Sequence, residues 1–174
     1  GKLNALDIGV GANCIYPLIA QRVHGWNVVG SDIDEVALKN AQTIIDKNKL
    51  NDSISLRLQT DTAKIFEGII SKDDFFHFTI CNPPFHASAE DAAHSSNRKN
   101  RNLGHKKNNL NFGGKNTEIW CEGGEIEFIT KMIHESVNYK KNVHWFTCLV
   151  SRYESMPFLL EELKKLDIKT VRTL

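Results

Sequence analysis

The chain of 174 residues has no apolar run long enough to cross a membrane, so the sequence predicts neither a membrane-spanning protein nor a membrane partner. Its four cysteines, at positions 14, 81, 121 and 148, form no Cys-x-x-Cys pair, and the histidines show no ligand spacing. These absences argue against a zinc site and a thioredoxin-like motif, and no metal is expected. Free cysteines of this kind fit a reducing cytoplasm, which is the predicted location.

A strong overall charge is also missing, since the net charge is only +1. The charge is nevertheless unevenly distributed. Residues 1–85 carry 8 basic and 10 acidic side chains, and residues 118–174 carry 8 and 9. Residues 86–117 carry 6 basic and 2 acidic side chains, so the positive excess lies in one block.

Strand-like and helix-like patterns alternate along most of the chain. Strands are expected at residues 3–8, 26–30, 54–59, 75–81, 143–150 and 168–174, and helices at residues 15–23, 34–47, 62–70, 122–137 and 155–166. Such alternation predicts an α/β fold with a mainly parallel sheet covered by helices on both faces.

The first expected strand ends in a glycine turn, Gly9-Val10-Gly11, directly before a helix. Glycine lets the backbone approach a ligand, and the start of a helix favours polar or anionic groups. Asp32 follows the second strand about 20 residues later, where an acidic side chain suits a ribose diol. A nicotinamide dehydrogenase is the rival interpretation, but Cys14 occupies the third glycine position of its fingerprint.

Asn82-Pro83-Pro84-Phe85 follows the apolar strand at residues 75–81. The prolines fix the backbone, so that the Asn82 oxygen and a nearby carbonyl face outward as acceptors. The ring of Phe85 provides a flat surface on which a base can stack. An exocyclic amine donating to both acceptors is well placed for methyl transfer. The alternative is a rigid turn without a chemical role.

Residues 86–120 interrupt the alternating pattern with a stretch rich in Asn, Lys, Arg, His and Gly. A long stretch of this kind within a domain is functional or disordered. We therefore weigh an RNA-contacting loop against a solvated insertion. The candidate phosphate contacts are Arg98, Lys99, Arg101, Lys106 and Lys107.

Four candidate residues follow different strands: Gly9, Asp32, Asp61 and Asn82. In open parallel sheets, ligands bind beyond the carboxyl ends of the strands. The four are thus expected to share one site.

The combined motifs resemble the bacterial large-subunit ribosomal RNA adenine-N6-methyltransferase family, which has eukaryotic relatives that modify a small nuclear RNA. The resemblance covers essentially the whole chain and rests on residues 6–18, 81–88, 111–114, 118–125 and 128–133. Its most distinctive stretch is Glu118-Ile-Trp-Cys-Glu-Gly-Gly-Glu125.

The resemblance implies a class I, Rossmann-like methyltransferase fold, S-adenosylmethionine as the donor and N6 of an adenine in 23S ribosomal RNA as the acceptor. It assigns Asp7, Gly9, Gly11, Asp32, Asp61 and Asn82 to cofactor binding and Asn82, Pro83 and Phe85 to the target base. Within this picture Asp32 binds the ribose, and Asp61 or its neighbours lie near the cofactor adenine. No general base is required, because the methylated amine is acidic enough to release its proton to solvent.

The family pattern continues beyond both ends of this chain, with an RNA-binding segment before it and a final hairpin after it. We therefore expect one methyltransferase domain over residues 1–174, truncated at both ends, and a monomer. Glu122 and Glu125 of the distinctive stretch have an alternative, purely structural interpretation: acidic side chains that cap a helix start and complement its charge. Two alternative functions are a glutamine-amide methyltransferase acting on protein and a non-catalytic RNA-binding module; the basic block argues against the first and the intact motifs against the second.

Overall fold

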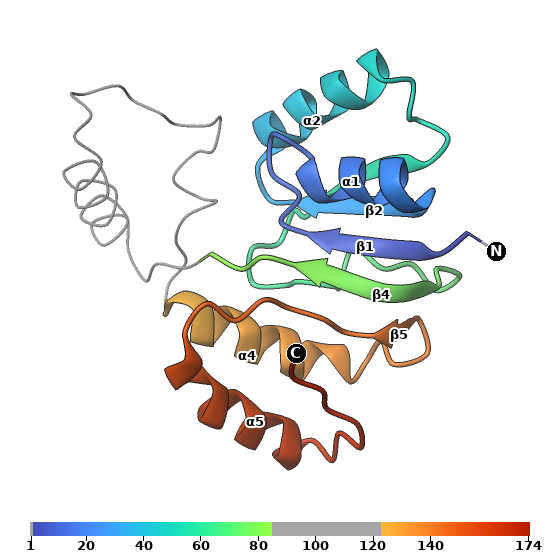
Figure 1. Ribbon diagram of the computed structural model, residues 1–174. Coiled ribbons are helices and arrows are strands. Elements are labelled where there is room, and N and C mark those ends of the chain that lie inside the picture. Colours follow the sequence, from blue (N-terminus) through green and yellow to red (C-terminus); the bar gives the residue numbers. More distant parts are fainter. Residues whose placement is uncertain (1, 85–122) are drawn as a thin grey trace, which may run out of the picture.

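The computed structural model describes residues 2–84 and 123–174. They form a five-stranded parallel sheet in the order β3-β2-β1-β4-β5 (Figure 1). The strands are β1 (Asn4–Ile8), β2 (Asn27–Asp32), β3 (Ile54–Leu58), β4 (Phe76–Cys81) and β5 (Val143–Trp145). The helices are α1 (Ile15–His24), α2 (Glu35–Lys47), α4 (Gly124–Ser136) and α5 (Met156–Lys165), with a short 3-10 turn η2 (Tyr153–Ser155) before α5. The predicted α/β architecture is confirmed.

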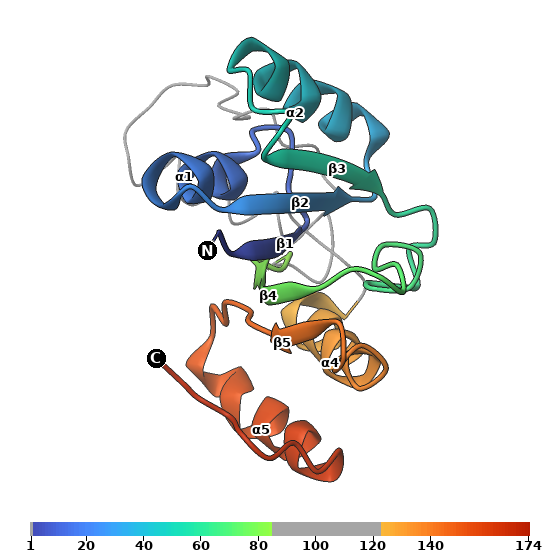
Figure 2. The ribbon, with the colours of Figure 1, turned by 90° about the vertical axis from the view of Figure 1, so that its right-hand side faces the viewer.

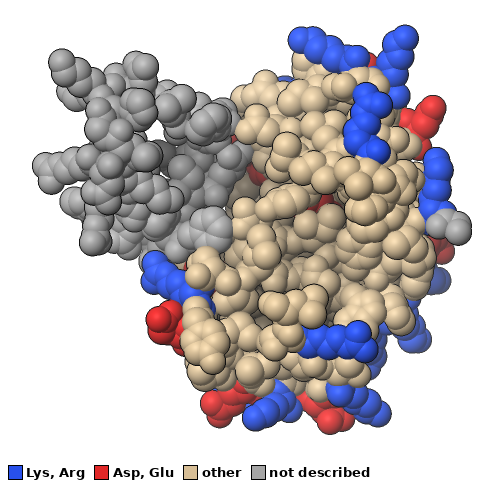
Figure 3. Space-filling model, in the orientation of Figure 1, with Lys and Arg blue, Asp and Glu red and all other residues tan. Residues whose placement is uncertain are grey.

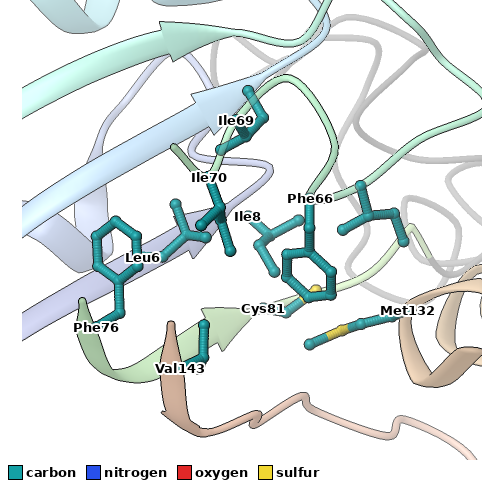
Figure 4. Packing of buried hydrophobic residues seen from close by; sticks show 10 residues of the cluster. Leu6, Ile8, Phe66, Ile69, Ile70, Phe76, Cys81, Met132 and Val143 are labelled. Carbon is teal, nitrogen blue, oxygen red and sulfur yellow. The ribbon is translucent and has the colours of Figure 1, made fainter. Parts of the chain in front are cut away.

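Both faces of the sheet are covered, as the views in Figures 1 and 2 show. Helices α1 and α2 pack on one face, where Leu38 and Ile45 of α2 meet Ile54 of β3. On the other face, residues 65–70 and α4 enclose a second core. Figure 4 shows this core, in which Phe66 and Met132 approach the side chains of β1 and β4. Helix α5 packs against α4 rather than directly on the sheet.

The helix expected at residues 62–70 is replaced by turns. Ile65, Phe66 and Ile69 are buried, so their spacing satisfies the core without a regular helix. The carboxylate of Glu135 on α4 accepts the backbone N–H groups of residues 65, 66 and 67, at 2.8, 2.9 and 2.6 Å. These bonds occupy donors that a helix would use internally.

Strand β5 is shorter than the expected 143–150, because a side chain interrupts the ladder. The hydroxyl of buried Thr79 accepts the Thr147 N–H at 2.8 Å and donates to the Thr147 carbonyl at 3.1 Å. The hydroxyl therefore occupies the place of a backbone partner. One further backbone bond, from Leu149 N–H to the Cys81 carbonyl at 2.9 Å, follows at the edge. The strand expected at 168–174 is also absent, since these residues form no ladder with the described strands.

Candidate active site

The glycine turn after β1 is fixed to the end of β2. Gly9 and Gly11 have φ of 74° and 64°, in the left-handed region that favours glycine. The N–H groups of Gly9 and Val10 both donate to the Ser31 carbonyl, each at 2.9 Å. A Cβ added at Gly9 would meet no atom within 4 Å, so open space borders the turn.

Asp32, at the end of β2, contacts this turn directly. Its carboxylate is largely buried, with one oxygen accepting the Gly11 N–H and the other the Asp34 N–H, both at 2.9 Å. Each oxygen keeps further acceptor capacity for a hydroxyl donor. The structure therefore brings Gly9, Gly11 and Asp32 together as predicted from the sequence.

Asp7, on β1, has a different environment. Its side chain is fully buried, and neither carboxylate oxygen has a hydrogen-bond partner within residues 2–84 and 123–174. Burial and the nearby charge of Asp32 raise the pKa of Asp7 to about 7. Buried polar groups rarely lack partners, so this carboxyl group suits a ligand that brings its own donor.

The Asn82 segment leaves the sheet beside the glycine turn. Ile8 pairs with Cys81 in the β1–β4 ladder, so the next residues, Gly9 and Asn82, emerge side by side at the carboxyl edge. Asn82 is exposed, whereas Pro83 is buried, and its ring fixes the backbone φ next to Asn82. The glycine turn and the exposed amide of Asn82 therefore lie next to each other.

Asp61 lies beyond β3 in a turn that is tied to Asp32 through Gln59. The Gln59 N–H donates to the Asp32 carbonyl at 2.8 Å, and the Gln59 side chain accepts the Asp61 N–H at 2.9 Å. One carboxylate oxygen of exposed Asp61 accepts the Ala63 N–H at 2.9 Å. Its role toward a cofactor stays a prediction.

Several predicted site residues lie outside the described residues. They are Phe85, Arg98, Lys99, Arg101, Lys106 and Lys107. Glu122 and most of the distinctive 118–125 stretch also lie there.

Glu125 is described and lies in the first turn of α4, where an acidic side chain complements the helix start as expected. Its buried carboxylate also reaches the segment after β5, accepting the Ser151 N–H at 2.5 Å and the Ser155 hydroxyl at 3.4 Å. The sequence held a signal for this burial, because Glu125 shares one helical stripe with Ile129 and Ile133.

Neither a metal cluster nor a membrane span is found in the described part of the chain. Within it, no three His, Cys, Asp or Glu residues cluster in a way that would hold a metal ion. None of its helices has both the length and the apolar character needed to span a membrane.

A parallel sheet covered on both faces, with a glycine turn after β1, an acid after β2 and Asn-Pro-Pro after β4, defines a class I methyltransferase fold. The RNA methyltransferase family model matches residues 1–174, and the chain belongs to that family.

Curated relatives named ribosomal RNA large subunit methyltransferase F are similar over nearly the whole chain. The protein from Flavobacterium psychrophilum is 52% identical over 173 residues, covering 97% of this chain and 55% of the relative. The protein from Bacteroides fragilis is 52% identical over 171 residues, covering 96% and 56%. The chain thus spans a little over half the length of these relatives.

Solved human structures share the fold. The METTL16 catalytic domain in complex with the MAT2A 3′UTR hairpin 1 has a TM-score of 0.79 and 31% identity, covering 97% of this chain and 57% of that one. The N-terminal domain of METTL16 in complex with SAH has a TM-score of 0.73 and 26% identity, covering 99% and 55%.

Proposed function

We propose that this chain is the methyltransferase domain of an enzyme that methylates N6 of a specific adenine in 23S ribosomal RNA with S-adenosylmethionine. The observation that carries the proposal is the meeting of the glycine turn, Asp32 and Asn82-Pro83 at the carboxyl edge of three adjacent strands. The substrate follows the relatives named ribosomal RNA large subunit methyltransferase F. Such a substrate implies action in the cytoplasm, where bacterial ribosomes assemble.

The described residues fit this cofactor. Asp32 offers carboxylate oxygens to the ribose hydroxyls, and Gly9 leaves open space beside the backbone. The unpartnered Asp7 carboxyl offers acceptors for the ammonium group, while Asp61 lies in the turn assigned to the adenine. S-adenosylmethionine supplies an electrophilic methyl group when it is bound.

The residues that follow β4 hold and orient the adenine N6 amine, which is the methyl acceptor. The Asn82 side-chain oxygen accepts a hydrogen from N6, and this bond strengthens as the nitrogen gains positive charge. Buried Pro83 fixes the backbone beside Asn82. Phe85 is assigned the role of stacking on the adenine ring. The proton leaves the methylated nitrogen for water, so no side chain has to act as a base.

The direct test is transfer of a tritiated methyl group from S-adenosylmethionine to protein-free 23S ribosomal RNA, followed by nucleoside analysis. We expect the label in N6-methyladenosine. Label in another nucleoside, or none in RNA, would overturn the proposal. Label in a glutamine side chain of added ribosomal protein would favour the amide methyltransferase instead.

A binding test isolates the cofactor assignment. Asp32→Ala removes a charged acceptor and should weaken S-adenosylmethionine by about 1.5–3 kcal/mol in calorimetry. Asp73→Ala is the matched control, since Asp73 is exposed at the opposite end of the sheet. Affinity within twofold of the parent for Asp32→Ala would show that the ribose assignment is wrong.

A further inference from the structure

The turn between β5 and α5 presents an arginine and a tyrosine to solvent. Tyr153 is 85% exposed, the highest value among the large aromatic side chains that the structure describes as exposed. Arg152, beside it, is also exposed. Exposure of a whole aromatic ring carries a hydration cost and contributes nothing to the core.

This turn is nevertheless firmly anchored. The buried carboxylate of Glu125 holds Ser151 and Ser155, which bracket the exposed pair on both sides. The Ser155 N–H also donates to the Arg152 carbonyl at 3.0 Å, closing the turn. A buried charge therefore fixes a turn whose own side chains point away from the protein, an arrangement that suits binding.

The turn also lies next to Cys81 and Asn82, at the end of β4. The Leu149 N–H donates to the carbonyl of Cys81, and Asn82 follows Cys81 directly. Only residues 150 and 151 separate Leu149 from Arg152. The exposed pair thus stands on the segment that flanks the amide assigned to the target amine.

An arginine beside a tyrosine matches the chemistry of unpaired RNA. Bases stack on aromatic rings, and a guanidinium group binds phosphate through paired donors. Glu154 follows Tyr153, so the turn has no net charge. Recognition therefore rests on stacking and one phosphate contact.

We propose that Arg152 and Tyr153 bind an unpaired nucleotide adjoining the target adenine, Tyr153 by stacking on its base and Arg152 by contacting its phosphate. The inference rests on the proposed function, because it takes Asn82 as the position of the target.

The test compares Tyr153→Ala and Arg152→Ala with two matched controls. Phe75→Ala changes a 49% exposed aromatic at the amino end of β4, and Arg22→Ala changes an exposed arginine near the end of α1. The probe is a fluorescein-labelled, twelve-nucleotide oligoadenylate titrated at several salt concentrations. Methyl transfer to 23S ribosomal RNA and calorimetry with S-adenosylmethionine accompany it.

Tyr153→Ala should weaken oligoadenylate about 5- to 150-fold, the equivalent of one base that no longer stacks on an aromatic ring. Arg152→Ala should make the slope of log affinity against log salt shallower by about 0.7. Both should raise KM for 23S ribosomal RNA and leave cofactor affinity within twofold. The control variants should match the parent throughout.

The outcomes separate the two proposals. A parent that methylates 23S ribosomal RNA, with Tyr153→Ala and Arg152→Ala indistinguishable from the controls, overturns this inference alone. A parent that neither binds oligoadenylate nor methylates the RNA overturns the proposed function and this inference with it. Loss of thermal stability in Tyr153→Ala would also count against the inference, because it would give the ring a structural role.

Discussion

Two aspartates at neighbouring strand ends show how environment separates one residue type into two roles. Asp32 receives two backbone N–H groups and is held as an acceptor. Asp7 is fully buried without a partner among the described residues, and its pKa is raised to about 7. The folded protein therefore contains a carboxyl group that costs stability when it is charged.

This cost predicts an unusual pH dependence for the free protein. The raised pKa of Asp7 means that the folded state holds a proton that the unfolded state releases above a pH of about 3.9. Stability should therefore fall with rising pH between about 4 and 7, by up to about 1.4 kcal/mol per pH unit from this group, and level off above. Asp7→Asn should lack this loss in urea unfolding at a series of pH values.

Asp73→Asn provides the comparison, since its carboxyl group is exposed. The parent and this control should lose stability in parallel, and Asp7→Asn should diverge upward as the pH rises. Parallel curves for all three proteins would show that Asp7 is not strained in the folded state.

Asn82→Ala should remove turnover while sparing both binding steps. The proposed bond to the target amine strengthens in the transition state, and losing such a group costs on the order of 10²–10³ in rate. Single-turnover methylation of 23S ribosomal RNA at saturating cofactor measures it, with Asn138→Ala as an exposed control. If Asn82→Ala retained more than about a tenth of the parent rate, Asn-Pro-Pro would be only a turn.

At the residue scale the sequence predicted that the candidate site residues lie together, but not which contacts they make. Glycine spacing and the ends of apolar runs located Gly9, Asp32 and Asn82, because these signals are local. The partners of Asp7 and Glu125 depend on which segments meet in space. Local sequence therefore could not show that one carboxyl group lacks donors and the other holds Ser151.

At the scale of elements, α4 holds two loops in place through hydrogen bonds to glutamates at its opposite ends. Glu125 holds the turn after β5, and Glu135 holds residues 65–67. These loops were the least predictable elements. The spacing of the buried apolar residues at 65–70 is also typical of a helix, although the structure has turns there. The Thr79 hydroxyl ends β5 early, although the apolar run in the sequence continues beyond it.

The hydrogen bonds from residues 65–67 to Glu135 predict that mutation of Glu135 has a local effect on this loop. Glu135→Ala leaves three backbone N–H groups without their charged acceptor, so the protein should lose about 2 kcal/mol or more of stability. Hydrogen exchange should accelerate at Ile65, Phe66 and Glu67 and stay unchanged at the centre of β1. Glu127→Ala changes an exposed glutamate of the same helix and should do neither. Unchanged exchange at 65–67 would mean that packing alone holds the loop.

At the scale of the whole molecule, the alternating pattern predicted a parallel sheet covered on both faces. That signal is strong because buried parallel strands and amphipathic helices differ in periodicity. The distribution of charge was equally visible in the sequence. On the face of the molecule that Figure 3 shows, the visible lysines and arginines are spread out, with acids among them, and form no single patch. The basic block at 86–117, with 6 basic and 2 acidic side chains, stays the predicted site of phosphate contacts.

Neutralising Arg98, Lys99, Arg101, Lys106 and Lys107 together should weaken RNA binding and leave cofactor affinity intact. The slope of log affinity against log salt should become shallower by roughly 0.7–0.9 for each phosphate that the variant no longer binds. A control variant should neutralise Lys39, Lys47, Lys49, Lys72 and Lys141, which are exposed elsewhere. Equal slopes for the two variants would show that the basic block is a solvated insertion that does not contact RNA.

The strand order has a consequence for synthesis of the chain. Ala5 of β1 meets Val28 on one side and Phe78 on the other, so the central strand has an open edge until β4 has been made. The first 58 residues contain β1, β2 and β3, and with them the glycine turn and Asp32. The glycine turn and Asp32 can thus assemble on a ribosome before Asn82 and Pro83, which are assigned to the target amine, have been made, and closing the longer β1–β4 loop becomes the slower step. A protein proposed to modify ribosomal RNA would have Asn82 and Pro83 in place only after that closure.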